Sequence, residues 1–262
     1  MRLCQLTIAV LIGALGAAAA LAEDRVATTQ SGTNQSAARV SPAQAAIDRA
    51  ATAKKYVFLF FWKEKGAQTD KAWDVLQPAI AKMADSADTV SIQIANPAEK
   101  KVVDKYGVSR APMPLVLAVA PNGAITKAFT KTFGEKELRT AFVSPCTQRC
   151  LKALQNGKLV FVCVVDQANP KDKVATFKGV EDFKADKKYD AVTEVILVNQ
   201  RDAKEAAFLK ELDVAGFAPM TVFLAPPGAT IGTFHRGTAK EVFVAKLAAA
   251  QSGCGAGCSC HH

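Results

Sequence analysis

The segment Ala111-Pro112-Met113-Pro114 precedes an apolar run, Leu115-Val116-Leu117-Ala118-Val119, and its opening recurs as Ala218-Pro219-Met220 before a second apolar run. Proline cannot donate a hydrogen bond to a sheet ladder, so a proline just before an apolar run marks the start of a strand. X-Pro bonds are also where cis peptide bonds occur. We therefore predict a duplicated domain in which Pro112 and Pro219 are structural cis-prolines.

Two further landmarks support the duplication. Ser41-Pro42 and Ser144-Pro145 each open a helix-like stretch, and an apolar run follows each stretch after Lys55 and Lys158. Both of these landmarks recur after 103 residues, and the Ala-Pro-Met landmark recurs after 107. Chance apolar runs would not keep this register, so we expect two units of about 105 residues, a normal domain size.

The N-terminus has the pattern of an export signal. Arg2 precedes an apolar stretch that ends in the small-x-small sequence Ala20-Leu21-Ala22. This order predicts a signal peptide over residues 1–22, cleaved after Ala22, and a periplasmic or secreted protein. A membrane anchor is the alternative, but the stretch is short for a span of ~20 residues and the acidic pair Glu23-Asp24 follows it. No other segment is apolar for long enough to span a bilayer.

Residues 23–40 are polar and non-periodic, which predicts a flexible tether.

The charge pattern disfavours nucleic-acid binding. Lysine and arginine outnumber the acidic residues by 33 to 24, which gives a formal net charge of +9. The two signs alternate along most helix-like segments, and no basic run is interleaved with aromatic residues. Such a pattern is typical of solvated surfaces. We expect a protein client as partner, and no nucleic acid.

The first unit alternates helix-like and strand-like segments. Strands separated by helices imply parallel crossovers, and the tight turn Pro121-Asn122-Gly123 implies an antiparallel pair at the end of the same sheet. The fold class is therefore α/β, with a mixed sheet flanked by helices. The expected order is helix 42–54, strand 56–62, helix 67–84, strand 89–95, helix 98–106, hairpin 114–130 and helix 134–143.

This order resembles the thioredoxin fold. The stretch Phe60-Phe61-Trp62-Lys63-Glu64-Lys65 looks like the strand end and Trp-bearing turn of thioredoxins, and Tyr106 to Pro112 looks like the segment that carries their cis-proline. The second unit matches mainly through Val214 to Thr221 and its terminal hairpin. The resemblance implies two tandem thioredoxin-like domains, at residues 41–143 and 144–250, followed by a flexible tail at 251–262.

The chain departs from this family at the redox turn. Thioredoxins carry two cysteines there, separated by two residues, but this chain has Gly66-Ala67-Gln68-Thr69 in the first unit and residues near Gln167-Ala168-Asn169-Pro170 in the second. Neither stretch contains a thiol, so dithiol exchange is chemically impossible at this place, and we expect no enzyme of the usual kind. The prolines would then serve the architecture, or edge a peptide-binding groove as in non-catalytic domains of disulfide isomerases.

Cysteines occur elsewhere. Ser144 as N-cap and Pro145 at the first helical position predict that Cys146 lies in the first turn of a helix, with Cys150 on the same face. The positive helix end should ease ionisation of a thiol there. The pair fits a redox couple, a second metal site or a disulfide, although a bridge within a helix would strain it. Burial of Cys150 is the alternative. Cys163 lies in an apolar strand and is expected to be a buried small residue.

The spacing of Cys146 and Cys150 also resembles that of the copper-binding thioredoxin-like assembly factors of cytochrome oxidase. In those proteins the motif occupies the redox turn and a distant histidine joins it. Here it lies on the helix before the first strand of the second unit.

The terminal segment gathers soft metal ligands. Its three thiols and two imidazoles are separated by glycine and serine, which let the backbone wrap around one centre: Cys254, Cys258, Cys260, His261 and His262. Thiolates with imidazole suit Cu(I) or Zn(II). Disulfide formation among these cysteines, or a cloning remnant at the histidine pair, are the alternatives.

These observations lead to three hypotheses for the function. The first is an exported metallochaperone-like protein that binds Cu(I) or Zn(II) through its tail. The second is a thiol-disulfide oxidoreductase using Cys146, Cys150 and the tail cysteines, and the third is a non-catalytic peptide-binding scaffold. The only histidine outside the terminal pair is His235, and no glycine-rich phosphate loop follows a strand, which disfavours hydrolases and nucleotide-dependent enzymes.

Overall fold

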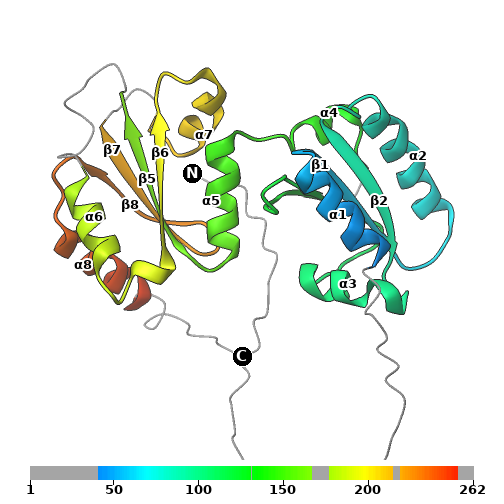
Figure 1. Ribbon diagram of the computed structural model, residues 1–262, viewed down its shortest axis with the longest axis horizontal. Coiled ribbons are helices and arrows are strands. Elements are labelled where there is room, and N and C mark those ends of the chain that lie inside the picture. The colour runs from blue at the N-terminus through cyan, green and yellow to red at the C-terminus, as the bar shows by residue number, and fades with distance from the viewer. Residues whose placement is uncertain (1–40, 131, 167–176, 215–218, 253–262) are drawn as a thin grey trace, which may run out of the picture.

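The structure, a computed structural model, describes residues 41–130, 132–166, 177–214 and 219–252. These residues form two α/β lobes joined by a short linker (Figure 1). The predicted signal peptide, the predicted tether and the tail residues 253–262 lie outside the described residues. Among the residues that are described, none belongs to a helix with the length and apolar character needed to cross a membrane.

The first sheet is built around β1 (Tyr56–Trp62). The strand order is β2-β1-β3-β4, in which β2 (Ala87–Gln93) runs parallel to β1, while β3 (Leu115–Val119) is antiparallel to both β1 and β4 (Ile125–Phe129). Helices cover both faces of β1, so its apolar residues are buried on both sides, as expected for a central strand.

The two faces of this sheet have different helices. One face packs against α2 (Ala67–Ala81) and α4 (Glu135–Arg139), and the other against α1 (Pro42–Thr52) and α3 (Lys100–Tyr106). A one-turn 3-10 helix, η1 (Pro97–Glu99), leads into α3.

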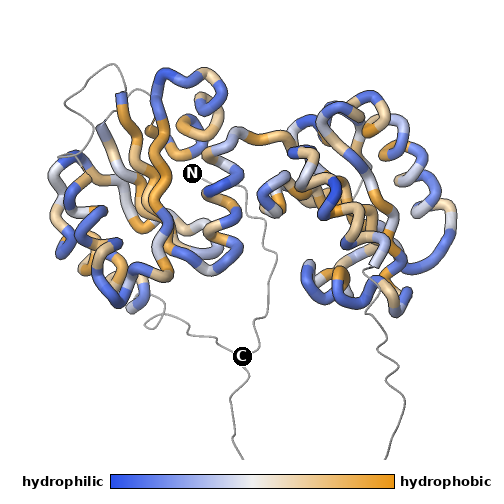
Figure 2. Tube along the Cα trace, viewed as in Figure 1, coloured by the Kyte–Doolittle hydropathy of each residue, from blue (hydrophilic) through white to orange (hydrophobic). Residues whose placement is uncertain are grey.

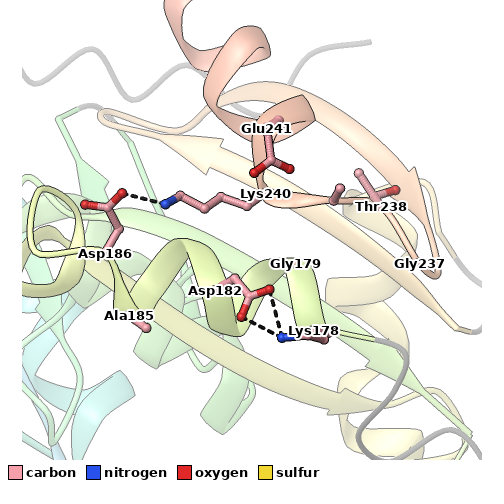
Figure 3. A pocket seen from close by; sticks show the side chains of 10 residues that line it. Lys178, Gly179, Asp182, Ala185, Asp186, Gly237, Thr238, Lys240 and Glu241 are labelled. Atoms are coloured by element: carbon pink, nitrogen blue, oxygen red, sulfur yellow. Dashed lines mark hydrogen bonds and ion pairs between the residues drawn. The ribbon is translucent and has the colours of Figure 1, made fainter.

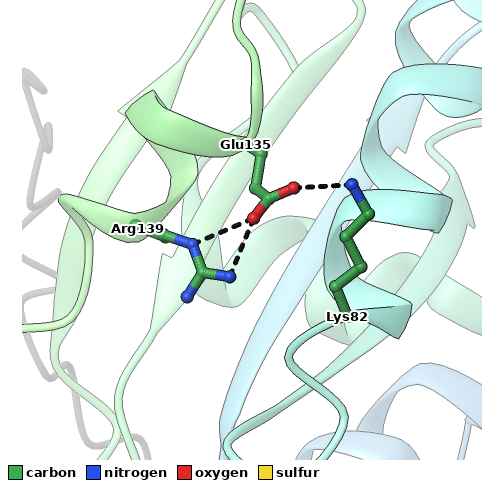
Figure 4. Close-up of polar contacts among 3 residues, drawn as sticks. All are labelled: Lys82, Glu135 and Arg139. Atoms are coloured by element: carbon green, nitrogen blue, oxygen red, sulfur yellow. Dashed lines mark hydrogen bonds and ion pairs between the residues drawn. The ribbon is translucent and has the colours of Figure 1, made fainter.

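The short helix α4 is tied to α2 by an ion network. Glu135 accepts hydrogen bonds from Lys82 Nζ at 2.9 Å and from Arg139 Nη2 at 2.8 Å (Figure 4). Lys82 directly follows α2, and Leu138 of α4 is fully buried against the sheet. Five helical residues would not be stable alone, so these contacts hold α4 in place.

The second sheet repeats this arrangement in the order β6-β5-β7-β8. Its strands are β5 (Leu159–Val165), β6 (Thr193–Asn199), β7 (Met220–Ala225) and β8 (Ala229–His235). Its helices are α5 (Pro145–Gln155), α6 (Lys178–Ala185), α7 (Ala206–Glu211) and α8 (Lys240–Ser252), with the one-turn helices η3 (Asp190–Val192) and η4 (Ala203–Glu205). Figure 2 shows the hydrophobic strands at the centre of this lobe. The prediction of two tandem thioredoxin-like domains is confirmed.

The structure corrects the position of the cis-proline. The cis peptide bond in the first domain is Met113–Pro114, so the prediction that Pro112 is the cis-proline is wrong. Pro114 is buried and directly precedes β3, whereas Pro112 is exposed. A further cis bond, Pro226–Pro227, lies in the turn between β7 and β8.

The strand registers give the reason for this error. Leu115 pairs with Phe61 of β1, and Met220 pairs with Val164 at the equivalent place in β5. Leu115 and Met220 are therefore structural equivalents, so Pro219 corresponds to Pro114. The repeated letters Ala-Pro-Met lie two residues out of structural register. Since Ala218 is outside the described residues, a cis bond before Pro219 stays a prediction.

Candidate functional site

The turn after β1 occupies the place where thioredoxins carry their redox cysteines. It is held by side-chain hydrogen bonds: Trp62 Nε1 donates to Ser91 Oγ at 2.8 Å, and Thr69 Oγ1 donates to the carbonyl of Glu64 at 2.9 Å. The exposed residue Gly66 caps α2 without a side-chain hydrogen bond. The turn thus has a defined shape but no thiol.

The cis-proline segment lies across from this turn. Because Leu115 pairs with Phe61, extending the same antiparallel register places Pro114 opposite Trp62. Met113 is half-buried and packs against the core cluster shared by α1 and α3. The indole of Trp62 and the proline therefore flank the carboxyl end of β1.

Cys146 lies in the first turn of α5, as predicted, but its surroundings suppress ionisation. Its backbone N–H donates to Glu205 Oε1 at 3.2 Å, and its Sγ lies 3.7 Å from the carbonyl oxygen of Leu197. Burial, followed by the hydrogen bond to Glu205 and the charge of that carboxylate, raises the pKa of Cys146 to about 12. Our expectation that the helix end eases ionisation is wrong, because burial disfavours the thiolate and Glu205 adds a negative charge at that end.

The other two described thiols are buried more deeply. Cys150 is 3% exposed and packs in the core beneath α5, where burial and the neighbouring Cys146 raise its pKa to about 12. Cys163 is fully buried in β5, and burial raises its pKa to about 12 as well. All three are free thiols. A thiol with such a pKa is protonated at neutral pH and is a poor nucleophile.

A pair of buried glutamates was missed by the sequence reasoning. Glu205 ends η4 and is 4% exposed, and its carboxylate also accepts a hydrogen bond from Ser144 Oγ. Glu99 ends η1 in the first domain, is 5% exposed, and accepts from the backbone N–H of Ala43 at 3.3 Å. Each glutamate therefore caps the first helix of its own domain. The sequence does hold one sign of this pair, because Glu99 and Glu205 are 106 residues apart. The same separation relates the equivalent first residues of β2 and β6, Ala87 and Thr193.

A cleft of about 780 Å³ lies between α6 and the start of α8. Lys178 pairs with Asp182 at 2.9 Å, and Lys240 pairs with Asp186 at 2.6 Å (Figure 3). The hydrogen bond from Lys240 is the main reason why the pKa of Asp186 is lowered. The lysines and aspartates of the cleft neutralise one another, and its lining residues include no cysteine or histidine.

Metal ligands do not cluster within the described ranges. Between residues 41 and 252, leaving aside the gaps at 131, 167–176 and 215–218, no group of three or more His, Cys, Asp or Glu side chains could hold a metal ion. Cys146 and Cys150 belong to no such group. The predicted ligands Cys254, Cys258, Cys260, His261 and His262 lie outside the described residues. Helix α8 ends at Ser252, one residue after the predicted start of the tail at residue 251 and two before Cys254.

Comparisons with known proteins find similarity to solved structures only, at low identity. No protein-family model matches the chain, and no curated protein matches it. Thioredoxin O2 from Arabidopsis thaliana is 16% identical over 38% of this chain and 85% of its own, with a TM-score of 0.32. The first two thioredoxin domains of Saccharomyces cerevisiae Eps1p are 11% identical over 78% of this chain and 94% of their own, with a TM-score of 0.30.

Human ERp44 in its zinc-bound form is 9% identical, with a TM-score of 0.34, and the match covers 79% of this chain and 59% of that protein. At these identities the likeness extends to the fold alone. The two sheets define the fold class, which is α/β with two tandem thioredoxin-like domains.

Proposed function

We propose that this chain is a non-catalytic, exported tandem thioredoxin-like protein that binds a soft metal, Cu(I) or Zn(II), through its C-terminal tail. In this role it acts like a metallochaperone: the tail captures the ion, and the folded domains bind a protein client. The proposal assigns the five tail ligands, Cys254, Cys258, Cys260, His261 and His262, to one metal site.

The observation that carries the proposal is the environment of the described thiols: Cys146 lies beside Glu205, and Cys150 and Cys163 are buried. Burial raises the pKa values of Cys146, Cys150 and Cys163 to about 12. Metal ions bind the thiolate, so these three residues are poor ligands at neutral pH. The tail sequence places its thiols in a glycine-rich and serine-containing segment without large apolar side chains. Its donor set fits a tetrahedral zinc site, and two or three of its thiolates suffice for Cu(I).

The same observation disfavours the oxidoreductase hypothesis. A dithiol exchanger needs a reactive thiolate, whereas Cys146 lies beside a carboxylate and Cys150 lies in the core. The peptide-binding scaffold remains the second candidate. It is supported by Trp62 at the carboxyl end of β1, where extending the strand register places Pro114 opposite an aromatic residue and the turn that follows has no thiol.

The test compares the full chain with a chain that ends at Ser252, both purified anaerobically and reduced. Ending at Ser252 keeps α8 complete. We expect one Cu(I) or Zn(II) per full chain and none in the shortened chain, measured by elemental analysis and by competition with a chromophoric chelator. A Cys146→Ser, Cys150→Ala variant of the full chain should keep its metal. Equal metal content in the full and shortened chains would contradict the proposal.

A further inference from the structure

Helix α5 contacts both domains. Cys150, Ala153 and Leu154 on one face pack into the core of the second domain. Leu151 instead packs against the core cluster of the first domain that contains Tyr56 and Phe58. Figure 1 shows α5 on the side of its lobe that faces the first domain.

Tyr56 fixes the linker between the domains. Its hydroxyl group donates to the carbonyl oxygen of Val143 at 3.2 Å and accepts from the backbone N–H of the same residue at 3.0 Å. Gln148 of α5 donates from Nε2 to the Tyr56 hydroxyl and to the Val143 carbonyl, both at 3.1 Å. The ring of Phe142 packs on that of Tyr56 with 4.7 Å between centroids. A residue from each domain therefore holds the same linker peptide.

A second polar contact joins α5 to the edge strand β4. Gln155 Oε1 accepts from the backbone N–H of Ile125 at 2.9 Å, and Gln155 Nε2 donates to the carbonyl of Ile125 at 2.7 Å. The side-chain amide of Gln155 thus forms the two hydrogen bonds that a neighbouring strand would form with Ile125. It satisfies a backbone N–H and a carbonyl group that an edge strand otherwise leaves unpaired. Lys152 Nζ also donates to the carbonyl of Gly123, at 3.5 Å.

The equivalent helix of the first domain lacks this surface. Helix α1 precedes α5 by 103 residues in the repeat, so Asp48 and Thr52 occupy the positions of Leu151 and Gln155. Both are exposed and polar. The domain-facing side of α5 is therefore a special feature of the second copy and not a property of the repeat.

We propose that Tyr56, Gln148, Leu151 and Gln155 form an interdomain clasp that makes the two domains one rigid unit. Relative motion is the usual expectation for domains joined by a short linker. Here both backbone polar groups of Val143 are bonded, and one helix is packed into both domains, so hinge motion between Val143 and α5 would break the contacts of Gln148, Leu151 and Gln155 together. The carboxyl ends of β1 and β5 are then held at a fixed distance and orientation. This inference is independent of metal binding by the tail.

Residual dipolar couplings measured on the full chain test this proposal. A single alignment tensor should fit the backbone couplings of both domains in the unaltered protein. The Leu151→Asp, Gln155→Thr variant gives α5 the residues that α1 carries, without touching the core face of α5. It should require two different tensors while each domain keeps its own fold.

The matched control is Asp48→Asn, Thr52→Ala on α1, which should keep a single tensor. Gln155→Ala is a milder variant of an exposed residue, and it should already reduce the agreement with a single tensor. Two tensors in the unaltered protein would overturn the proposal, and so would a single tensor in the Leu151→Asp, Gln155→Thr variant.

Discussion

The buried carboxylate of Glu205 accepts the backbone N–H of Cys146 at 3.2 Å and raises the pKa of the neighbouring thiol. Glu205→Gln keeps an oxygen for the helix N-terminus but removes the negative charge. The pKa of Cys146 should then fall toward its ordinary value, although burial, the larger cause, still holds it high. A fall of one pKa unit means about tenfold more thiolate at a given pH.

We therefore expect alkylation of Cys146 by iodoacetamide at pH 8 to become faster in this variant, by about tenfold for each unit by which the pKa falls, as measured by mass spectrometry of the modified peptide. The matched control is Glu99→Gln, which alters the equivalent cap in the first domain, where the capped residue is Ala43. It should leave the rate unchanged. A slower or unaltered rate in Glu205→Gln would show that the carboxylate does not suppress this thiol.

The main features of the fold could be predicted because they follow local patterns. Strand β1 has the predicted ends, residues 56 and 62. Its apolar run is continuous because every residue from Tyr56 to Phe61 is buried between two layers of helices. The predicted ends of helices and strands that depend on turns agree less well with the structure. Strand β2 begins at Ala87 and not at residue 89, because Tyr56 pairs with Ala87 at the start of the parallel ladder.

The environment of the thiols could not be predicted, because it depends on contacts between distant parts of the chain. Glu205 reaches Cys146 from 59 residues away, and a local helix pattern gives no sign of it. The prediction of the cis-proline was wrong for a related reason. The repeated tripeptide Ala-Pro-Met matches Pro112 with Pro219, whereas the strand pairing matches Pro114 with Pro219.

The stability of the protein should fall in alkaline solution. Burial raises the pKa values of Cys150 and Cys163 from an ordinary value of 9.0 to about 12. The folded state thus keeps protons that the unfolded chain releases. This contribution is complete below about pH 9 and is lost as the pH rises toward 12, with a slope of about 1.4 kcal/mol per pH unit for each thiol.

Urea unfolding between pH 8 and 11 measures this effect. Cys163→Ala should lower the free energy of unfolding at pH 8 but make its decrease with pH less steep, because one raised thiol is gone. Thr52→Ala, an exposed change, should leave the slope as it is. An equal slope in Cys163→Ala would mean that Cys163 does not contribute to the alkaline loss.

Gly179 permits close packing of α6 against the segment before α8. A Cβ atom at this position would lie 2.0 Å from the carbonyl oxygen of Thr238, and a backbone atom cannot rotate away. Gly179→Ala should therefore lower the free energy of unfolding by ~1–3 kcal/mol. Gly66→Ala is the control, since no atom lies within 4 Å of the added Cβ, and it should cost only the ~0.5–1 kcal/mol by which alanine is a poorer N-cap than glycine. Urea unfolding of both variants makes the comparison, and equal midpoints would contradict the packing argument.

The affinity of the tail for metal should depend on pH, and changes in the core of the folded domains should not alter this dependence. Thiolates and neutral imidazoles are the ligand forms, so binding releases protons and the affinity for Zn(II) should fall as the pH drops from 8 to 6. Cys258→Ser, Cys260→Ser should remove most of the binding, because these two thiols are separated by one residue and can hold the same ion. Cys163→Ser, a change in the core, should leave the affinity and its pH dependence unaltered while lowering the unfolding temperature. Chelator competition at each pH gives the affinities, and an affinity that does not change between pH 8 and 6 would exclude a thiolate site in the tail.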